Sequence, residues 1–475
     1  MTRDPGAVAS ASIESHAGEH DALSLARTLP PGARRRTITS GNGETSPQSI
    51  GSVNADMRAR YFPGWNVVGA TFVMALLSFG LGFYGVSVYV ATLQRLHGWS
   101  AYAVSAPVTV YYVAGALLTA VMSDLYSRFG PRAVVGTGAV AMAAGLLLLG
   151  RVSAPWQLYP AFLVMSVGWG AMSGAAVNII LAPWFERRRG LAVSLAFNGA
   201  TLGGVFVTPA LLPLIDTLGF RRALASAALA QLAVLAVAAR VMSRSPAELG
   251  LGPDGDPVLP PRRAAPASGE AHWRRAALGT WRFWSVSAPF ALGLAAQVGV
   301  LTHLVALVAP VLGPIAAGRA VSAATAAAVL GRLGTGLVVD RLSRRGVASA
   351  TLCIQVAGLA LLAWAPSVAV LYAGCVLFGL GVGNLTTLPG LVLAVEWPRE
   401  RFSSLVGLVV GINQFTFAFG PSLVGVVRDT AGGYPTALVV CMGLEAVAAG
   451  LVLLGPGRVS EGEPAAPLPA RTPRD

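Results

Sequence analysis

Twelve long apolar segments constrain this chain more than any other feature of its sequence. An α-helix needs about 20 predominantly apolar residues to cross the hydrocarbon layer of a membrane. Segments of this kind lie at residues 65–90, 101–122, 133–150, 156–183, 190–214, 222–242, 283–311, 318–339, 347–365, 367–395, 403–427 and 433–455. The pattern predicts an all-α membrane protein with twelve transmembrane helices in two pseudo-symmetric six-helix bundles.

The composition agrees with lipid as the main solvent. Only 12% of the residues are charged, whereas soluble domains carry roughly 25%. The net charge of +13 would suggest a nucleic-acid partner if it lay on one soluble face, but the basic residues, all of them Arg, separate the apolar segments. The three cysteines, Cys353, Cys375 and Cys441, have no metal-type spacing and are interpreted as buried small hydrophobes.

Polar segments divide the chain into five parts. Residues 1–60 and 457–475 are predicted to be disordered cytoplasmic tails, and no cleavable signal peptide is evident. Residues 61–243 and 282–456 are predicted to form the two bundles. The linker at 244–281, rich in Pro and Arg, is predicted to be cytoplasmic.

The arginines test this topology. With the N-terminus inside, 27 of the 34 fall in cytoplasmic segments, six in external ones and one, Arg332, inside a helix. Cytoplasmic loops of membrane proteins carry such an excess of positive charge. The bias therefore supports an even number of spans with both termini in the cytoplasm. The expected location is a bacterial cytoplasmic (inner) membrane.

Two loops share a motif that connects the chain to a known family. Residues 336–345 read GLVVDRLSRR, and residues 123–132 read SDLYSRFGPR. Both resemble the G-x-L-x-D-R-x-G-R-R loop of the major facilitator superfamily, and the likeness extends over about residues 61–456. The resemblance implies the twelve-helix fold and assigns the gating of the inward face to the charged residues of these loops: Asp124, Arg128, Arg132, Asp340, Arg341, Arg344 and Arg345.

Other segments resemble one branch of that superfamily. The segment WFERRRGLA at 184–192, continued by Gly199 and Gly203, is similar to the monocarboxylate and oxalate/formate branch, as is the segment after Arg244. There are departures. Ser127 stands where the family has Asp in the first loop, and Ala328 where animal monocarboxylate carriers have an Asp before the helix-8 Arg. The proton-coupled mechanism of those carriers is therefore not transferred.

Polar residues of several apolar segments fall at the depth where carriers of this design bind substrate. With a rise of ~1.5 Å per residue, each lies about 12–21 Å from the end of its segment. They are Arg332, Asn198, Thr201, Gln297, Asn384, Asn413, Gln414, Tyr111 and Tyr112. Adjacent residues cannot share a helix face, so we expect at most one of the two tyrosines to face the substrate fully.

Arg332 is the strongest candidate for a substrate-binding residue among them. An arginine at membrane depth costs about 2.5–3.5 kcal/mol on insertion scales, so it should face protein, water or a ligand. Its planar set of donors suits a carboxylate. The alternative is that Arg332 caps helix carbonyls or supports the Asp340 loop. We favour the ligand role. For the neutral polar residues, a role in gluing helices together is a stronger alternative.

Two further ionisable residues are candidates for a proton-linked role. His303 is expected near the external mouth, where a wetted side chain without a role is the favoured interpretation. Glu445 is expected in the middle of the last helix, protonated and bonded to a neighbouring helix. The Gly379-x-Gly381-x-Gly383 and Gly407-x-x-x-Gly411 patterns lie in apolar helices and predict close packing, not a dinucleotide site.

The sequence shows no Walker loop, catalytic triad or metal-ligand cluster, so we expect neither an enzyme nor a cofactor. The prediction is a monomeric secondary transporter that moves a small organic anion, a mono- or dicarboxylate, by alternating access. Arg332 would be the counter-charge, and a counter-transported anion or protons would supply the coupling. An exporter of amphipathic drugs or metabolites is the main alternative, and a non-transporting membrane sensor the remote one.

Overall fold

The computed structural model describes residues 62–242, 245–256, 275–339, 341–365, 367–397 and 402–455, with the side chains of 402–404 excepted. Within these ranges the backbone is helical and contains no β-strand. The predicted tails, most of the predicted linker and Asp340 lie outside the described residues.

The helices fall into an N-terminal set and a C-terminal set. The N-terminal set comprises α2 (Gly64–Phe79), α3 (Gly85–His97), α4 (Ala101–Leu149), α5 (Leu158–Met172), α6 (Gly174–Leu181), α7 (Arg189–Leu202), α8 (Thr208–Leu218) and α9 (Phe220–Val241). The C-terminal set comprises α11 (Trp281–Leu312), α12 (Pro314–Val338), α13 (Arg344–Ala363), α14 (Val368–Val382), α15 (Leu388–Glu396), α16 (Phe402–Phe417), α17 (Gly420–Ala431) and α18 (Tyr434–Leu453). Short helical turns follow α9 at Pro246–Leu249 and Pro253–Gly255.

Ten helices in the described residues are long and apolar enough to cross a membrane. One of them, α4, has 49 residues and covers two of the predicted apolar segments. Gly130 turns the chain sharply inside it with φ 80°, and Pro131 begins the next helical stretch, so the predicted loop at 123–132 is itself mostly helical. The apolar helix Val368–Val382 is shorter than the others.

Several helices are interrupted near their middle. The π-helical turn η2 (Gly80–Tyr84) joins α2 to α3, and the π-helical turn η4 (Gly203–Val207) joins α7 to α8. Ser173, with an extended backbone, separates α5 from α6. Residues 383–387 separate α14 from α15. Such interruptions leave backbone polar groups free of the regular helical ladder, which membrane proteins tolerate where protein or water covers them.

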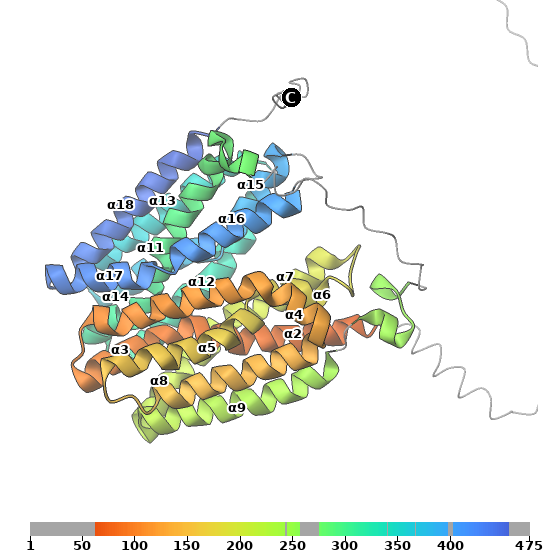
Figure 1. Ribbon diagram of the computed structural model, residues 1–475. Coiled ribbons are helices and arrows are strands. Elements are labelled where there is room, and N and C mark those ends of the chain that lie inside the picture. Colours follow the sequence, from red (N-terminus) through yellow and green to blue (C-terminus); the bar gives the residue numbers. More distant parts are fainter. Residues whose placement is uncertain are drawn as a thin grey trace, which may run out of the picture. The chain divides into compact units, whose positions relative to one another are not determined.

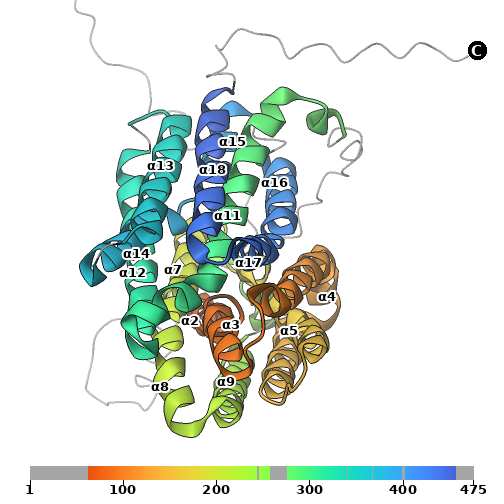
Figure 2. The same ribbon diagram turned by 90° about the vertical axis from the view of Figure 1, so that its left-hand side faces the viewer.

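Each set packs mainly on itself. In Figures 1 and 2, α4, α5 and α9 lie beside one another, as do α13, α14 and α18. Large apolar side chains such as Leu330 (65% exposed) and Leu337 (75% exposed) remain on the outside of α12. An outward apolar surface of this kind is stable in lipid and unfavourable in water.

The core differs between the two ends of the helices. We call the end that holds residues 124–132, 182–188, 245–256 and 341–344 the arginine-rich end. There, the C-terminal set has a core of its own, which includes Phe283, Val347, Leu393 and Val452. Towards the opposite end, one continuous core joins the two sets, with Val88 and Val108 in the same cluster as Leu304 and Val424. The described structure is thus closed at the opposite end.

Candidate functional site

Arg332 of α12 lies where the two sets of helices meet. Its Nη1 donates to Thr201 Oγ1 of α7 at 3.4 Å, and its Nε donates to the Gly383 carbonyl oxygen, just after α14, at 3.4 Å. The Tyr84 ring packs on Gly204, three residues after Thr201, and so lies beside this contact. We call Arg332, Thr201, Tyr84 and Gly383 the Arg332 cluster. Both hydrogen bonds are long, so the guanidinium retains donor capacity.

Glycines bring these elements close enough to form the cluster. A Cβ on Gly383 would lie 3.0 Å from Arg332 Nη2 and 2.8 Å from the Ala328 carbonyl oxygen. A Cβ on Gly203 would lie 2.7 Å from the Gly80 nitrogen, and one on Gly204 would lie 2.9 Å from the Tyr84 ring. Small residues allow helix backbones to approach closely in membranes. These glycines therefore set how far apart Thr201, Tyr84 and Arg332 lie.

The π-helical turns η2 and η4 pack against each other beside the cluster. Tyr84 is the last residue of η2, and Thr201 lies two residues before η4. Single π-helical turns occur frequently at functional sites because they re-aim side chains. Tyr84 was missed by the sequence reasoning. The glycine pairs Gly80-x-Gly82 and Gly203-Gly204 were a signal that could have pointed to it.

Five aromatic side chains lie next to this cluster, and we call them the aromatic cluster: Phe79, Phe83, Tyr112, Trp169 and Phe417. The Phe83 ring stacks on Trp169 at 5.9 Å and lies 6.0 Å from the Tyr112 ring. The Tyr112 ring meets Phe417 of the C-terminal set edge-on at 5.5 Å. The Phe79 ring lies 5.0 Å from Trp169. The Phe83 ring also lies 5.1 Å from that of Tyr84, which connects the two clusters.

The other predicted site residues occupy different environments. Tyr111 is buried and donates to the Gly82 carbonyl oxygen at 2.8 Å, within the N-terminal set, whereas its neighbour Tyr112 reaches Phe417. Gln297 is buried and accepts a hydrogen bond from Gln355 at 2.9 Å, inside the C-terminal set. Asn198 is exposed, one helical turn before Thr201.

The three remaining amides lie on α16 and after α14. Asn384 Nδ2 donates to the carbonyl oxygens of Leu380 at 3.2 Å and Gly331 at 3.4 Å, which ties α12 to α14. Asn413 is buried, and its Oδ1 has no hydrogen-bond partner among the described residues. Gln414 is half-buried. Asn384 thus adjoins the Arg332 cluster through Gly383, while Asn413 and Gln414 lie close in sequence to Phe417 of the aromatic cluster.

This arrangement, together with the fold, can be compared with known proteins. The sequence profile described as Major Facilitator Superfamily matches residues 70–315 and 304–474. The chain belongs to the Major Facilitator Superfamily. It is therefore a multi-pass membrane transporter and not an enzyme.

Relatives place the chain within that superfamily. Monocarboxylate transporter 11 of Mus musculus is 29% identical over 411 residues, which cover 80% of this chain and 84% of the relative. A putative anionic 4-hydroxy-benzoate permease of Thauera aromatica is 35% identical over 120 residues, or 25% of this chain and 73% of the relative. These matches confirm the predicted likeness to the monocarboxylate branch.

Among solved structures, the D323A mutant of the nucleoside transporter NupG matches with a TM-score of 0.67 and 11% identity, over 82% of this chain and 99% of that one. At that identity the likeness shows the fold alone.

The superfamily loop motifs hold their own set of helices together. Arg132 Nε donates to the Met242 carbonyl oxygen at 2.7 Å and its Nη2 to that of Arg240 at 2.9 Å, at the end of α9. Arg345 donates at 2.6 and 2.8 Å to the two carboxylate oxygens of Glu396, and to the carbonyl oxygen of Val452 at 2.7 Å. Glu396 was missed by the sequence reasoning.

The other predicted gating residues make contacts within their own set of helices. Arg344 Nη1 donates to the Leu391 carbonyl oxygen, and the Arg341 amide donates to that of Val338 at 3.0 Å. The Arg128 guanidinium lies 5.3 Å from the Phe129 ring centroid. Asp124 is exposed, and its carbonyl oxygen accepts from Ser127 Oγ at 2.8 Å.

Hydrogen bonds between the two sets concentrate towards the end opposite the arginine-rich one. Asp429 near the end of α17 accepts from the amides of Ala101 at 3.1 Å and Tyr102 at 2.7 Å, at the N-terminus of α4. The hydroxyl oxygens of Thr109 and Ser422 are 2.6 Å apart. Free amides at a helix N-terminus favour an anion, so the Asp429 carboxylate stabilises the contact between α17 and α4.

His303 and Glu445 both differ from the expectations. His303 is buried and not wetted, because α17 and α18 cover it. Its Nε2 lies 3.1 Å from the Pro421 carbonyl oxygen and its Nδ1 3.2 Å from the Tyr434 hydroxyl, so Nε2 carries the proton. Glu445 is buried as predicted. Its carboxyl oxygens have no hydrogen-bond partner among the described residues, so the prediction of a hydrogen bond to a neighbouring helix is wrong.

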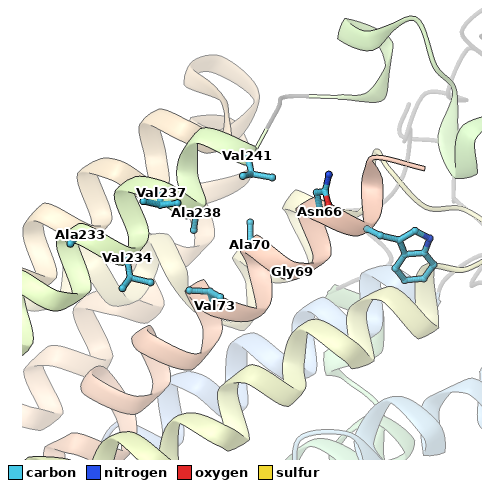
Figure 3. Close-up of a pocket in the computed structure, with 10 residues that line it drawn as sticks. Asn66, Gly69, Ala70, Val73, Ala233, Val234, Val237, Ala238 and Val241 are labelled. Atoms are coloured by element: carbon cyan, nitrogen blue, oxygen red, sulfur yellow. The ribbon is translucent and has the colours of Figure 1, made fainter. Parts of the chain in front are cut away.

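Two pockets lie away from the Arg332 cluster. An apolar groove of ≈ 870 Å³ lies between α2 and α9, with Val73 facing Val234 and with Asn66 towards one end (Figure 3). Trp65 also lines it. A second pocket of ≈ 560 Å³ is lined by Gly407 and Gly411. A Cβ on either glycine would meet nothing within 4 Å among the described residues, so the predicted close packing is wrong there.

The other glycine pattern does pack closely. A Cβ on Gly379 would collide with the Ala324 carbonyl oxygen, and one on Gly381 with the Gln355 side chain. Together with Gly383, these residues confirm the predicted close packing of α14.

Proposed function

We propose that the chain is a secondary carrier of small organic anions that bear a carboxylate, and that it works by alternating access. The observation that carries the proposal is Arg332. This fixed positive charge lies where the two sets meet, with two long hydrogen bonds, both to neutral acceptors.

The chemistry of Arg332 fits a carboxylate ligand. A guanidinium offers five N–H donors in a plane and binds a carboxylate with two parallel hydrogen bonds. Thr201 and Gly383 occupy only two of these donors, and both hydrogen bonds are long. The cost of holding a charge at this depth is offset when a bound anion neutralises it. The names of the relatives agree with this ligand, since a monocarboxylate and 4-hydroxybenzoate both carry a carboxylate.

The arrangement of the core supports alternating access. The two sets share one core towards one end and have separate cores at the arginine-rich end. We assign the arginine-rich end to the cytoplasm, because positive loops favour that side. The described state would then be open inwards. The loops that contain Arg128, Asp340, Arg341 and Arg344 would close that end in the other state.

We also propose the finer topology. A 49-residue helix would be about 74 Å long, more than twice the roughly 30 Å thickness of the hydrocarbon core of a bilayer, so α4 counts as two spans that meet at Gly130. With α14 and α15 as one interrupted span, the chain has twelve. Residues 61–243 and 282–456 would then be the two moving bundles of a monomer in the bacterial inner membrane, joined by a linker at 244–281, with both termini in the cytoplasm.

The test is uptake of radiolabelled carboxylates into proteoliposomes by the wild type and by Arg332→Gln. We expect saturable uptake by the wild type and a loss of at least about tenfold in Arg332→Gln, because the variant lacks the charge that pairs with the anion. Arg319→Gln is the matched control, since Arg319 lies on the same helix and is exposed.

Both variants would first be shown to insert and to elute as monodisperse protein. Uptake that survives Arg332→Gln would remove Arg332 from the substrate site. An absence of carboxylate uptake by the wild type would contradict the proposed substrate class.

An exporter of amphipathic compounds is favoured by one observation, the aromatic cluster. Such an exporter would have an aromatic wall and an arginine turned away from it. Arg332 instead reaches Thr201 of the opposite set, and Tyr84, which lies beside this contact, adjoins Phe83 of the aromatic cluster. The same experiment separates the two functions, because an exporter of neutral compounds would not need the Arg332 charge.

A further inference from the structure

The aromatic cluster lies at the depth expected for substrate and is built from distant parts of the chain. Phe79 and Phe83 come from α2 and η2, Tyr112 from α4, Trp169 from α5 and Phe417 from α16. Each lies near the middle of its span. Four belong to the N-terminal set and one to the C-terminal set, so the cluster spans the boundary across which the two sets would move.

The cluster is not a closed core. Trp169 and Tyr112 are buried, but Phe79, Phe83 and Phe417 are only half-buried. Aromatic rings prefer edge-to-face or offset partners at 4.5–7 Å between centroids. Rings that keep part of their surface open can take one more planar ring in the same geometry. A small aliphatic anion would leave that surface without a partner.

The cluster also adjoins the positive charge. Phe83 and Tyr84 are consecutive residues of one π-helical turn, and their ring centroids are 5.1 Å apart. The Tyr84 ring packs on Gly204, three residues after Thr201, which accepts a hydrogen bond from Arg332. A ligand whose carboxylate meets Arg332 would therefore direct the rest of its body towards Phe83.

One polar atom in the cluster needs a partner. The Tyr112 hydroxyl is buried and has no hydrogen bond among the described residues. A buried hydroxyl without a partner is costly, and in a native protein it calls for a water or a ligand group. A hydroxyl on the ligand ring, remote from the carboxylate, would supply that partner.

We propose that the aromatic cluster is the ring-binding part of the substrate site, and that the transported anion is an aromatic monocarboxylate, with a ring hydroxyl recognised by Tyr112. This inference rests on the proposed carrier function. It makes Phe83, Phe417 and Tyr112 specificity-determining residues, whereas Arg332 serves any carboxylate.

The experiment measures KM in proteoliposomes for benzoate, 4-hydroxybenzoate and phenylacetate, and for acetate, lactate and pyruvate. In the wild type, we expect a lower KM for the aromatic anions. Phe83→Leu and Phe417→Leu should raise the KM of the aromatic anions roughly three- to tenfold, because one ring contact is lost, and leave the aliphatic KM values nearly unchanged. Tyr112→Phe should raise the KM for 4-hydroxybenzoate but not for benzoate.

Phe415→Leu is the matched control. Phe415 lies two residues before Phe417 on the same helix, is 49% exposed, and packs on the exposed Phe419. It should alter neither class of KM.

Aliphatic uptake without aromatic uptake by the wild type would overturn this inference and leave the carrier function intact. An equal rise of every KM in Phe83→Leu would also overturn it, since the ring would then be structural. Failure of the whole panel would instead overturn the carrier function on which the inference rests. The wild-type preference needs no variant, so a misfolded Phe83→Leu would not block the test.

Discussion

At the scale of single residues, Arg345 holds four elements together at the arginine-rich end. Besides its two bonds to Glu396 at the end of α15, its guanidinium donates to Ser285 Oγ of α11 at 3.0 Å and to the Val452 carbonyl oxygen of α18. Both charged side chains are more than nine-tenths buried. Removing one partner of such a pair leaves an uncompensated buried charge. That loss lowers the free energy of unfolding far more than the loss of an exposed pair does.

We therefore predict that Glu396→Gln destabilises the fold by about 3–5 kcal/mol. The measurement is the melting temperature in detergent, which should fall for Glu396→Gln. Asp256→Asn is the control, because Asp256 pairs with Arg187 at 2.9 Å on an exposed surface, and it should melt like the wild type. Identical melting temperatures for all three proteins would show that the Arg345–Glu396 pair does not hold α13 to α15.

At the scale of elements, the segment after α9 folds back onto the junction between α6 and α7. The Asp254 carboxylate accepts from the amides of Glu186 at 3.0 Å and Arg187 at 2.7 Å, and the Asp254 amide donates to the Trp184 carbonyl oxygen at 2.9 Å. Asp254 adopts a left-handed backbone with φ 57°, which Asp tolerates better than most residues. This contact fixes residues 184–187 at the entrance to α7, the helix that carries Thr201.

This clamp should depend on pH. Burial tends to raise the pKa of Asp254, but hydrogen bonds from the amides of Arg187 and Glu186 outweigh it, and the pKa is lowered from 3.8. Because the folded pKa is depressed, the stabilisation is present above the unfolded value of about 3.9 and is lost as the pH falls through the lower folded value.

The measurement is hydrogen exchange of the amides of Glu186 and Arg187, in the wild type relative to Asp254→Asn. We expect these amides to be more protected in the wild type than in Asp254→Asn at pH 7. The ratio of the two exchange rates should approach one only below about pH 4. Asp216→Asn, which alters an exposed carboxylate on α8, should exchange like the wild type at every pH. A ratio already close to one at pH 7 would contradict the clamp.

At the scale of the whole molecule, the two sets of helices share a continuous core towards one end only. Asp429 and the Thr109–Ser422 hydrogen bond lie where the core is continuous, whereas the cores separate at the arginine-rich end. Separating rigid packed bodies at one end requires breaking few contacts, while bending each body would disturb its whole core. The proposed transport cycle therefore requires the Thr109–Ser422 contact to open.

A reversible cross-link tests that requirement. The hydroxyl oxygens of Thr109 and Ser422 are 2.6 Å apart, so cysteines at both positions lie within reach of a disulfide. In a background without the three native cysteines, we expect oxidised Thr109→Cys/Ser422→Cys to lose transport and dithiothreitol to restore it. Thr109→Cys alone should be insensitive to oxidant. Full transport by the cross-linked protein would rule out opening at this end.

The sequence could predict how deep a residue of the site lies along its own helix, but not which residues of distant helices contact it. The depth of Arg332 and Thr201 followed from counting residues along apolar segments, and the structure brings these two side chains together. Tyr84 was missed because its position depends on close packing between glycines of two distant segments. Glu396 was missed because its partner, Arg345, lies 51 positions away in the chain. His303 was misjudged because the residues that cover it, Pro421 and Tyr434, are more than 100 positions away in the chain.

The sequence by itself determined that the chain lies in a membrane as a set of apolar helices and belongs to a particular family of transporters. Those properties follow from the transfer free energies of consecutive apolar residues and from loop motifs, and both depend on residues that lie close together in the sequence. Only the tertiary structure decided which glycines pack closely and which aromatic rings gather beside Arg332. Gly379 packs closely against another helix, for example, whereas Gly407 does not. Contacts between distant helices depend on how closely their backbones approach and which faces they share, and a linear pattern does not record that approach.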